Sequence, residues 1–401
     1  MASNLIPPSP ARAPSGPEVH PPGPDDLVVV TGGAGFIGRH LVRALQAAGA
    51  RVRVLDALVA SVHGPEPVWP SELGGCERIR ADVRDPAALE QALEGCTLLY
   101  HLAAETGTGE SMYRAHRYVD VNVGGTALLC DALGRAASRP RRAVLASSRA
   151  VYGEGPWADA HGTRHPGTRT EADLARGRWD PVAPDGTPLV PLPMGPGCAL
   201  APSSVYGETK RAQEELFRLV LPPLGVEPWV LRLQNVYGPG QSTRNPYTGI
   251  LSIFSVLLLE GDEVRVFEDG LESRDFVFVD DVVAALLAAA AAPGAPVPVD
   301  VGTGRRVSVL EVARTLATLL ERGEEAVRVT GEYRLGDIRH ASADPGVLAA
   351  RLGVVPSVSF EEGVRRLVEW IRATERPRSR LADALAEMSA HGLLGSAGDR
   401  P

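Results

Sequence analysis

The chain has 401 residues, of which 44% are hydrophobic and 22% are charged. This hydrophobic content excludes an intrinsically disordered protein, and the net charge of -8 argues against a nucleic-acid-binding protein. None of the 4 cysteines belongs to a C-x-x-C pair, which argues against a disulfide scaffold and predicts a reducing, cytoplasmic location. The length suits one large α/β domain or two interlocked ones.

The N-terminal residues 1–25 are rich in proline and lack the apolar stretch of a signal peptide. They predict a flexible arm. The longest apolar runs, at residues 250–259 and 282–292, are much shorter than the roughly twenty residues that span a bilayer. We therefore expect buried helices at both runs and no membrane partner.

Strands and helices alternate from residue 27 onwards. Short apolar runs predict strands at 27–30, 51–55, 78–80, 97–102 and 142–146. Apolar residues at helical spacing predict helices between them, at 36–48, 86–93 and 121–133. Strand-helix-strand units of this length form parallel sheets with right-handed crossovers. This part of the chain predicts an α/β fold with a Rossmann-type, doubly wound parallel sheet.

Residues 154–203 interrupt the alternation, because Pro, Gly and Asp are dense there and no long apolar period is present. Such a stretch within a domain is typical of an insertion or a lid. Regular elements resume as a helix at 204–220, a strand at 230–233, a helix at 250–259, strands at 264–267 and 276–279, and a helix at 281–292. Beyond Arg376 we expect a short helix and a frayed end.

A glycine-rich turn joins the first predicted strand to its helix. Gly32, Gly35 and Gly38 have the spacing G-x-x-G-x-x-G. Glycines here allow a tight turn and let backbone amides approach a pyrophosphate at the helix N-terminus. Since the strand, the helix and a later acidic residue are all present, the motif predicts dinucleotide binding, with Phe36 and Ile37 beside the cofactor.

Acidic residues after the next two strands indicate which dinucleotide is bound. Asp56 ends the second strand, where a carboxylate can bind the adenosine ribose hydroxyls and would repel a 2′-phosphate. NAD is therefore favoured over NADP, with Arg39 as a counter-indication. Asp82 and Val83 follow the third strand and are placed to cover the adenine.

Lys210 is the only lysine among 41 basic residues. It completes a Tyr-x-x-x-Lys motif with Tyr206, and residues at this spacing lie on one face of a helix. An ammonium stabilises a phenolate, so we expect Lys210 to lower the pKa of Tyr206 toward neutrality, as a general base requires. Ser148, after a predicted strand, can hydrogen-bond a substrate hydroxyl beside Tyr206. These three residues form the predicted catalytic group.

These motifs resemble the extended short-chain dehydrogenase/reductase superfamily, and within it the nucleotide-sugar epimerase/dehydratase branch, over about residues 26–372. Further matching segments are HLAA at 101–104, VNVGGT at 121–126, RLQNVYGPG at 232–240, SRDFVFVDDV at 273–282 and YRLGDIR at 333–339. The resemblance implies additional cofactor contacts from Leu102, Ala103, Ala104 and Asn122. It also implies that the substrate diphosphate is bound by Asn235, Arg274 and Arg334, and arginine suits this task through bidentate hydrogen bonds.

The domain organisation follows from the same resemblance. Residues 26–220 are expected to form the NAD-binding Rossmann domain, with the insertion at 154–203. Residues 221–372 are expected to form mainly a smaller mixed α/β substrate-binding domain, interleaved with the first. Residues 1–25 and 373–401 are the arm and the C-terminal tail. The resemblance further implies a homodimer through helices that include the one carrying Tyr206.

The residues after Ser148 distinguish reactions within this branch. The 4,6-dehydratases carry an Asp-Glu pair there and the decarboxylating relatives a Glu, whereas this chain has Arg149 and Ala150. Chemistry is then confined to one carbinol carbon, which leaves 4-epimerisation or 4-ketoreduction. A finer resemblance, to dTDP-L-rhamnose 4-epimerase-like proteins, rests on residues 56–64, residues 107–113 and the insertion. The expected substrate contacts are completed by Thr106, Ser111, Ser148 and Arg149.

We therefore expect an NAD-dependent nucleotide-sugar 4-epimerase that acts on a dTDP-6-deoxy-L-hexose such as dTDP-L-rhamnose. It would oxidise C4 to a ketone and return the hydride to the other face. Two alternatives remain, an NAD(P)H-dependent 4-ketoreductase and a UDP-sugar 4-epimerase. A non-catalytic dinucleotide-binding protein is disfavoured, because Tyr206 and Lys210 are both present. His161, His165 and Cys198 are too few for a zinc site, so no metal is expected.

Overall fold

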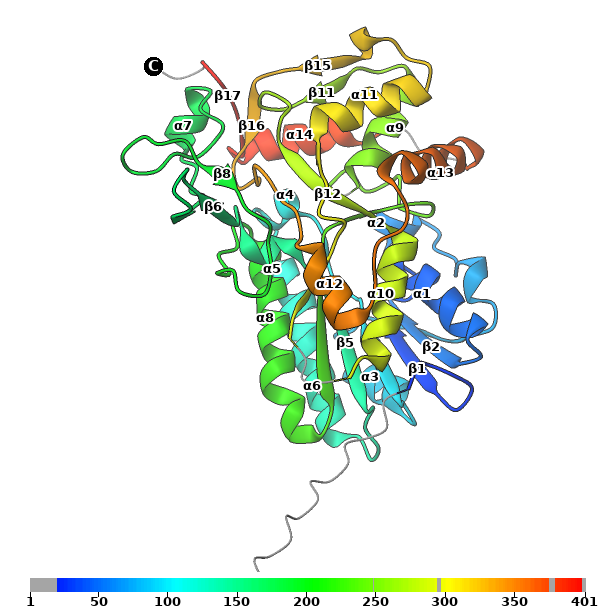
Figure 1. Ribbon diagram of the computed structural model, residues 1–401. Coiled ribbons are helices and arrows are strands. Elements are labelled where there is room, and N and C mark those ends of the chain that lie inside the picture. Colours follow the sequence, from blue (N-terminus) through cyan, green and yellow to red (C-terminus); the bar gives the residue numbers. More distant parts are fainter. Residues whose placement is uncertain (1–19, 248, 294–296, 375–378, 399–401) are drawn as a thin grey trace, which may run out of the picture.

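The computed structural model describes residues 20–247, 249–293, 297–374 and 379–398 (Figure 1). Of the arm predicted at residues 1–25, the part up to residue 19 lies outside the described residues. Within the described ranges, no helix has both the length and the apolar character needed to cross a membrane.

A seven-stranded parallel sheet forms the centre of the protein (Figure 1). Its strands lie in the order β3, β2, β1, β4, β5, β9, β13, and every neighbouring pair is parallel. Their bounds are β1 Leu27–Thr31, β2 Arg51–Asp56, β3 Glu77–Arg80, β4 Leu98–His101, β5 Arg142–Ser148, β9 Glu227–Leu233 and β13 Val299–Val301. Because the chain starts in the middle and winds outward in both directions, the predicted Rossmann-type sheet is confirmed.

Helices cover both faces of this sheet. One face carries α1 Phe36–Ala47, α10 Val279–Ala291 and α12 Pro345–Leu352, and the other carries α3 Pro86–Leu93, α6 Gly125–Arg135 and α8 Val205–Val220. Val28 and Val30 belong to the hydrophobic cluster of the first face, and Val29 belongs to that of the second. Successive strand residues point to opposite faces, and both faces are buried, so the strand appears in the sequence as a continuous apolar run.

A second hydrophobic core lies at the upper end of the molecule in Figure 1. Its helices are α9 Ile250–Glu260, α11 Val309–Leu319 and α13 Phe360–Ala373. Its strands are β10 Asn235–Tyr237, β12 Ser273–Phe278 and β14 Arg306–Ser308, with a separate pair of β11 Val264–Val266 and β15 Val327–Val329. Tyr237 packs edge-on against Phe276 and Phe278 within this core. This is the smaller mixed α/β unit that the sequence predicted.

The insertion at 154–203 has a small core of its own. Its three-stranded antiparallel sheet consists of β6 Pro156–Ala158, β7 Arg164–Pro166 and β8 Val190–Pro191, and α7 Glu171–Ala175 lies between the last two strands in the chain. Trp157 is buried there with Ala183 and Leu189. A core this small needs no repeated apolar pattern, which explains why the sequence showed none.

The C-terminal residues form more regular structure than the sequence predicted. α14 Leu381–Ala390 is the expected short helix. The chain then forms β17 Leu394–Ser396, which pairs antiparallel with β16 Glu332–Arg334. The expected frayed end is therefore wrong for these residues. Because β16, the strand that pairs with β17, is distant in the sequence, no local pattern could predict this pairing.

Three predicted elements begin three or more residues away from where they were expected. The strand expected at 230–233 is β9, which begins at Glu227. The helix expected at 121–133 is preceded by α5 Ala115–Tyr118 and a π-helical stretch Val119–Gly124, so α6 itself begins at Gly125. β12 begins at Ser273 rather than Phe276, because polar residues of the strand are buried as well. The remaining short elements are α2 Ala60–His63, α4 Thr108–Ser111, and 3-10 turns at Ser71–Leu73, Arg149–Tyr152, Pro222–Leu224 and Glu324–Ala326.

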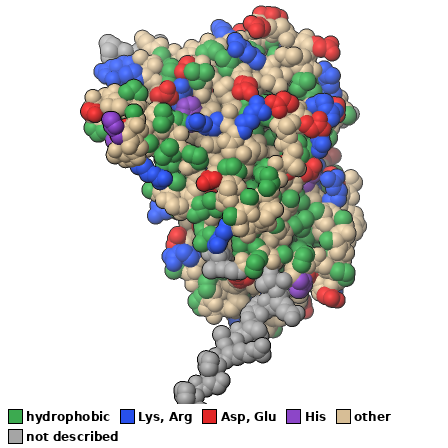
Figure 2. Space-filling model, viewed as in Figure 1, with side chains coloured by type: hydrophobic (Ala, Val, Ile, Leu, Met, Phe, Trp, Pro, Cys, Tyr) green, Lys and Arg blue, Asp and Glu red, His purple; other side chains and the backbone are tan. Residues whose placement is uncertain are grey.

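Acidic and basic side chains are interspersed over the face shown in Figure 2. That face presents no continuous stripe of one sign. This distribution is compatible with a protein that binds a charged ligand through a few charged side chains at the site, and not through a large surface of one charge.

Candidate active site

The predicted functional residues meet at one edge of the central sheet. Thr31, Asp56, His101 and Ser148 are the last residues of β1, β2, β4 and β5. Because these strands are parallel, their carboxyl ends lie along the same edge. Ligands of open α/β sheets bind outside this edge.

The glycine-rich turn after β1 has the close approaches that its sequence predicted. Gly32 has a φ of +71°, and a Cβ there would lie 2.7 Å from the backbone nitrogen of Ala103. A Cβ on Gly38 would collide with the carbonyl oxygen of Gly32. Helix α1 begins after Gly35 without a side-chain cap. Its first amide groups are thus available to an anion, and the turn fits the pyrophosphate of a dinucleotide.

Asp56 stabilises this turn. Its Oδ2 accepts a hydrogen bond from the Ala34 amide at 2.9 Å, and its Oδ1 accepts one from the Leu58 amide at 2.8 Å. Each carboxylate oxygen keeps a further lone pair, so these bonds are compatible with the predicted contact to ribose hydroxyls. Asp82 differs, because its carboxylate pairs with Arg84 at 2.8 Å.

The loop after β4 lies beside the glycine turn. Leu102 and Ala103 contact Gly32 through their backbones, and Ala104 follows them, half-buried. Val83 is buried and packs against the first residue of α6. The structure therefore brings the predicted nicotinamide-side and adenine-side residues to the same sheet edge as the glycines.

Asn122 is fully buried behind this loop. Its Oδ1 accepts a hydrogen bond from the Glu105 amide at 2.7 Å, and its Nδ2 donates to Thr209 Oγ1 at 3.0 Å. The side chain thus joins the loop after β4 to helix α8. Its predicted contact with the cofactor stays a prediction, while the structure shows a side chain that holds these two elements together.

The three predicted catalytic residues are close together. Ser148 ends β5, and its Oγ accepts a hydrogen bond from the Ala150 amide at 3.1 Å. Tyr206 and Lys210 lie one turn apart near the start of α8, and the Tyr206 hydroxyl is within hydrogen-bonding reach of Ser148. Lys210 donates from Nζ to the carbonyl oxygen of Ala146 at 3.0 Å.

The electrostatics of this group differ from the expectation. Burial raises the pKa of Tyr206 above its ordinary value, although a hydrogen bond with Ser148 and the charge of Arg149 lower it in part. Burial also lowers the pKa of Lys210 to about 8, and nearby Glu214 opposes that shift. The expected lowering of the Tyr206 pKa by Lys210 is therefore wrong for this structure. The ammonium is directed at a backbone carbonyl, and Arg149 is the cation that acts on Tyr206.

The predicted diphosphate ligands form a second cluster near this group. Arg149 donates from Nε to Asn235 Oδ1 at 2.8 Å. Asp337 pairs with Arg274 at 3.1 Å and with Arg334 at 2.7 Å. Although burial raises the pKa of Asp337, these two cations bring it well below its ordinary value. Asp337 was missed from the sequence; its signal was its position within the YRLGDIR segment, three residues after Arg334.

Two other predicted substrate residues have contacts within the protein. Ser111 is buried, and its Oγ donates to the carbonyl oxygen of Thr108 at 2.6 Å and accepts a hydrogen bond from the Tyr206 amide at 3.0 Å. Thr106 has an exposed side chain, and its carbonyl oxygen accepts a hydrogen bond from the Tyr118 hydroxyl at 2.8 Å. Ser111 therefore fixes the start of α8 beside Tyr206, the predicted catalytic tyrosine.

Ion pairs of two arginines join the insertion to the substrate side. Arg169 pairs with Glu154 within the insertion and with Glu268 outside it, at 2.6 Å in each case. Arg339, only 1% exposed, pairs with Glu268 at 2.9 Å and with the exposed carboxylate of Asp180 in the insertion at 2.8 Å. Breaking one partner of a buried pair is costly, so the Arg169–Glu268 pair holds the insertion against the substrate side. Sequence reasoning missed these ion pairs, because the partners are far apart in the chain.

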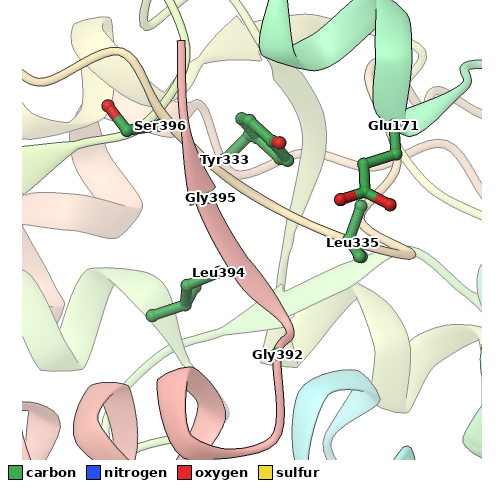
Figure 3. Close-up of a pocket in the computed structure, with 7 residues that line it drawn as sticks. All are labelled: Glu171, Tyr333, Leu335, Gly392, Leu394, Gly395 and Ser396. Atoms are coloured by element: carbon green, nitrogen blue, oxygen red, sulfur yellow. The ribbon is translucent and has the colours of Figure 1, made fainter. Parts of the chain in front are cut away.

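A pocket of about 240 Å³ lies between α7, β16 and β17 (Figure 3). Its lining residues are Glu171, Tyr333, Leu335, Gly392, Leu394, Gly395 and Ser396. It is separate from the catalytic group, since Ser148, Tyr206 and Lys210 do not line it. In the part of the chain that the structure describes, no three His, Cys, Asp or Glu residues are grouped to hold a metal.

Several known proteins are similar to this chain in sequence and in fold. Residues 28–173 and 180–302 match the NAD dependent epimerase/dehydratase family. The dTDP-L-rhamnose 4-epimerase of Burkholderia thailandensis is 41% identical over 349 residues, which cover 86% of this chain and 94% of that protein. MoeE5, solved in complex with UDP-glucuronic acid and NAD, is 30% identical with a TM-score of 0.66, over 86% of this chain and 99% of that chain.

A third similar protein is the UDP-N-acetylglucosamine 4-epimerase from Methanobrevibacter ruminantium, solved in complex with UDP-N-acetylmuramic acid. It is 26% identical with a TM-score of 0.70, over 87% of this chain and 99% of that chain. The family match covers more than half of the 401 residues, and the parallel sheet and glycine turn agree with it. The chain belongs to the NAD dependent epimerase/dehydratase family.

Proposed function

We propose that the protein is a nucleotide-sugar 4-epimerase whose substrate is a dTDP-6-deoxy-L-hexose such as dTDP-L-rhamnose. The observation that carries the proposal is the catalytic group itself. Ser148, Tyr206 and Lys210 lie together, and the residue after Ser148 is Arg149 rather than the first member of an acidic pair. The 41% identity to a dTDP-L-rhamnose 4-epimerase supports the choice of sugar.

NAD is the proposed cofactor. The turn at Gly32 and Gly38 and the uncapped start of α1 support binding of its pyrophosphate there, and we propose that Asp56 binds its adenosine ribose. We propose that Lys210 and Tyr206 hold the nicotinamide side. When bound, NAD supplies a reversible hydride acceptor for carbon 4 of the sugar.

The chain's own residues move and hold the proton. Tyr206 as phenolate takes the proton of the sugar 4-hydroxyl, and Ser148 orients that hydroxyl through its hydrogen bond to Tyr206. Arg149 favours the phenolate because its positive charge lowers the pKa of Tyr206. The resulting 4-keto sugar turns within the site and is reduced on the opposite face of carbon 4. Tyr206 then returns the proton to the oxygen on carbon 4.

We propose that the diphosphate stays bound to the protein while the sugar turns. Arg274 and Arg334 both pair with the carboxylate of Asp337. Arginine binds phosphate oxygens bidentately, so we propose these two side chains as the diphosphate ligands. Asn235, held by Arg149, links the diphosphate cluster to the catalytic group. The sugar can rotate about bonds beyond the diphosphate while the nucleotide stays in place.

The same residues would also serve a 4-ketoreductase or a UDP-sugar 4-epimerase. A ketoreductase consumes NAD(P)H in each turnover, whereas the proposed enzyme recovers its cofactor. The carboxylate of Asp56 disfavours the 2′-phosphate of NADPH. The proposed assembly is a homodimer and the proposed location is the cytoplasm; light scattering of the purified protein would test the assembly.

Incubation of the purified protein with dTDP-L-rhamnose, without added cofactor, tests the function. We expect a second chromatographic peak of unchanged mass, and the same mixture when the reaction starts from the other 4-epimer. No conversion of dTDP-L-rhamnose, together with consumption of NAD(P)H on a 4-keto sugar, would assign a ketoreductase. Conversion of UDP-sugars alone would retain the epimerase and change the substrate.

A further inference from the structure

The C-terminal segment, residues 381–398, lies against the substrate side of the molecule (Figure 1). Glu387 on α14 accepts hydrogen bonds from Arg114 at 3.0 Å and from the Tyr247 hydroxyl at 2.8 Å. Tyr113 donates to the Tyr247 hydroxyl at 2.8 Å, and its ring stacks on that of His391 at 4.6 Å. The segment is therefore bound to Tyr113 and Arg114, at the end of the segment 107–113 on which the finer resemblance rests.

A second set of contacts connects this segment with Arg334 and Tyr206. Met388 is buried, and a Cβ on Gly109 would lie 3.0 Å from its sulfur and 3.7 Å from Nη1 of Arg334. Two residues further along, Ser111 accepts the hydrogen bond from the Tyr206 amide. Helix α14 thus packs against residues 109–111, which also contact Arg334, a proposed diphosphate ligand, and Tyr206, the proposed general base.

Strand β17 holds the backbone of Arg334 itself. It pairs with β16 so that Leu394 lies opposite Arg334 and Gly395 opposite Tyr333. The Leu335 amide donates to the Leu393 carbonyl oxygen at 2.9 Å and extends the pairing. Figure 3 shows Leu394 and Gly395 beside Tyr333 in this arrangement. The strand that carries Arg334 is therefore bound along its length by the C-terminal segment.

We propose that residues 381–398 are a positioning element of the nucleotide-sugar site, which holds Arg334 and residues 107–114 in the geometry that binds the substrate diphosphate. This inference rests on the proposed function. The segment supplies no group to Tyr206 or Ser148 in the described contacts. It therefore acts on the affinity for the nucleotide sugar rather than on the transfer of the proton and hydride.

Two variants and one control test the inference. Glu387→Gln removes the charge that holds Arg114 and Tyr247, and a chain that ends at Thr374 removes the whole segment. Asp383→Asn is the matched control, because Asp383 lies on the same helix and its side chain is 76% exposed. Calorimetric binding of thymidine diphosphate to the NAD-containing protein gives a readout independent of turnover, and KM and kcat for epimerisation are measured beside it.

We expect the shortened chain to bind thymidine diphosphate about ten-fold or more weakly, and Glu387→Gln about three-fold more weakly, because small displacements of binding groups cost this much. KM rises in parallel, while kcat and the NAD content change little. Asp383→Asn should behave as the wild type. If the shortened chain does not fold, Glu387→Gln and its control still decide the matter.

Unchanged affinity and KM in Glu387→Gln overturn the inference, as does a fall in kcat at constant KM. A wild-type protein that binds no thymidine diphosphate overturns it as well. A wild-type protein that binds thymidine diphosphate but converts no sugar contradicts the proposed function alone, since the binding comparison then remains valid.

Discussion

Arg149 donates a hydrogen bond from Nε to Asn235 Oδ1 at 2.8 Å, while its Nη1 is buried without a hydrogen-bond partner among the described residues. Burial lowers the pKa of Arg149 to about 9, and the nearby cation of Arg274 adds to this effect. A buried N–H group without a partner is costly, so we propose that this side chain binds a ligand oxygen. Asn235 fixes the guanidinium so that its charge stays beside Tyr206.

Replacing Arg149 with methionine tests this relationship. We expect kcat/KM for epimerisation to fall about 100-fold, as is typical when one donor to a developing anion is lost. Since the charge of Arg149 lowers the pKa of Tyr206, its removal should move the acidic limb of the pH–rate profile to higher pH. Arg218→Met is the control, because Arg218 lies on the exposed side of α8 with a side chain that is 64% exposed. A profile that keeps its position would contradict the electrostatic role.

The proton transfer assigned to Tyr206 predicts a selective loss in Tyr206→Phe. We expect kcat to fall by about 1,000-fold, within the range for a lost general base. The NAD content and the affinity for thymidine diphosphate should remain, because the ring still packs in T-shaped contact with Tyr118. Retention of more than about a tenth of the wild-type kcat would show that another group takes the proton.

The single lysine makes its ionisation directly measurable. Protein grown with lysine labelled at 15Nζ gives one side-chain signal, from Lys210. We expect its pKa at about 8, because burial lowers it. The burial of the charged ammonium then lowers the free energy of unfolding by its full amount below about pH 8. This destabilisation declines as the pH rises toward the ordinary pKa of lysine. A titration midpoint above 10, as for an exposed lysine, would refute the burial that the structure shows.

Glu272 predicts a pH-dependent stability. Burial and the charge of Glu268 raise the pKa of Glu272 to about 8, while Arg274 opposes this shift. When folding raises the pKa of a carboxyl, the protein loses stability as the pH increases from the unfolded-state pKa to the folded-state pKa, because the charged carboxylate is disfavoured in the folded protein. Glu272→Gln should therefore raise Tm at about pH 9 and change it little at about pH 5.

The control for this variant is Glu90→Gln, an exposed glutamate paired with Arg135. It should change Tm little at either pH, because exposed pairs contribute little. Equal effects of Glu272→Gln at both pH values would show that its ionisation is not coupled to folding.

The central sheet, and the proximity of Ser148, Tyr206 and Lys210, could be predicted because their signals are local. The apolar run at Val28, Val29 and Val30, the glycine turn and the Tyr-x-x-x-Lys motif each lie within a short stretch, and parallel pairing brings the strand ends together without further information. The general fold and the grouping of these residues therefore followed from spacing and residue type.

Contacts between distant segments could not be predicted in the same way. The pairing of β17 with β16 and the Arg169–Glu268 ion pair depend on tertiary placement, for which the sequence holds no periodic signal. The direction of the Lys210 ammonium is a further example, since helical spacing places it near Tyr206 but does not show that it binds the Ala146 carbonyl. Burial, which raises the pKa of Tyr206, is likewise visible only in the folded protein.

The most direct test of the account follows the hydrogen on carbon 4. A dTDP-6-deoxy-L-hexose with deuterium at C4 is converted in ordinary water, without added cofactor, and the product is analysed by mass spectrometry and NMR. We expect inversion at C4 with the deuterium kept on that carbon, because the hydride leaves and returns within one site. Inversion with loss of the label to water would contradict it.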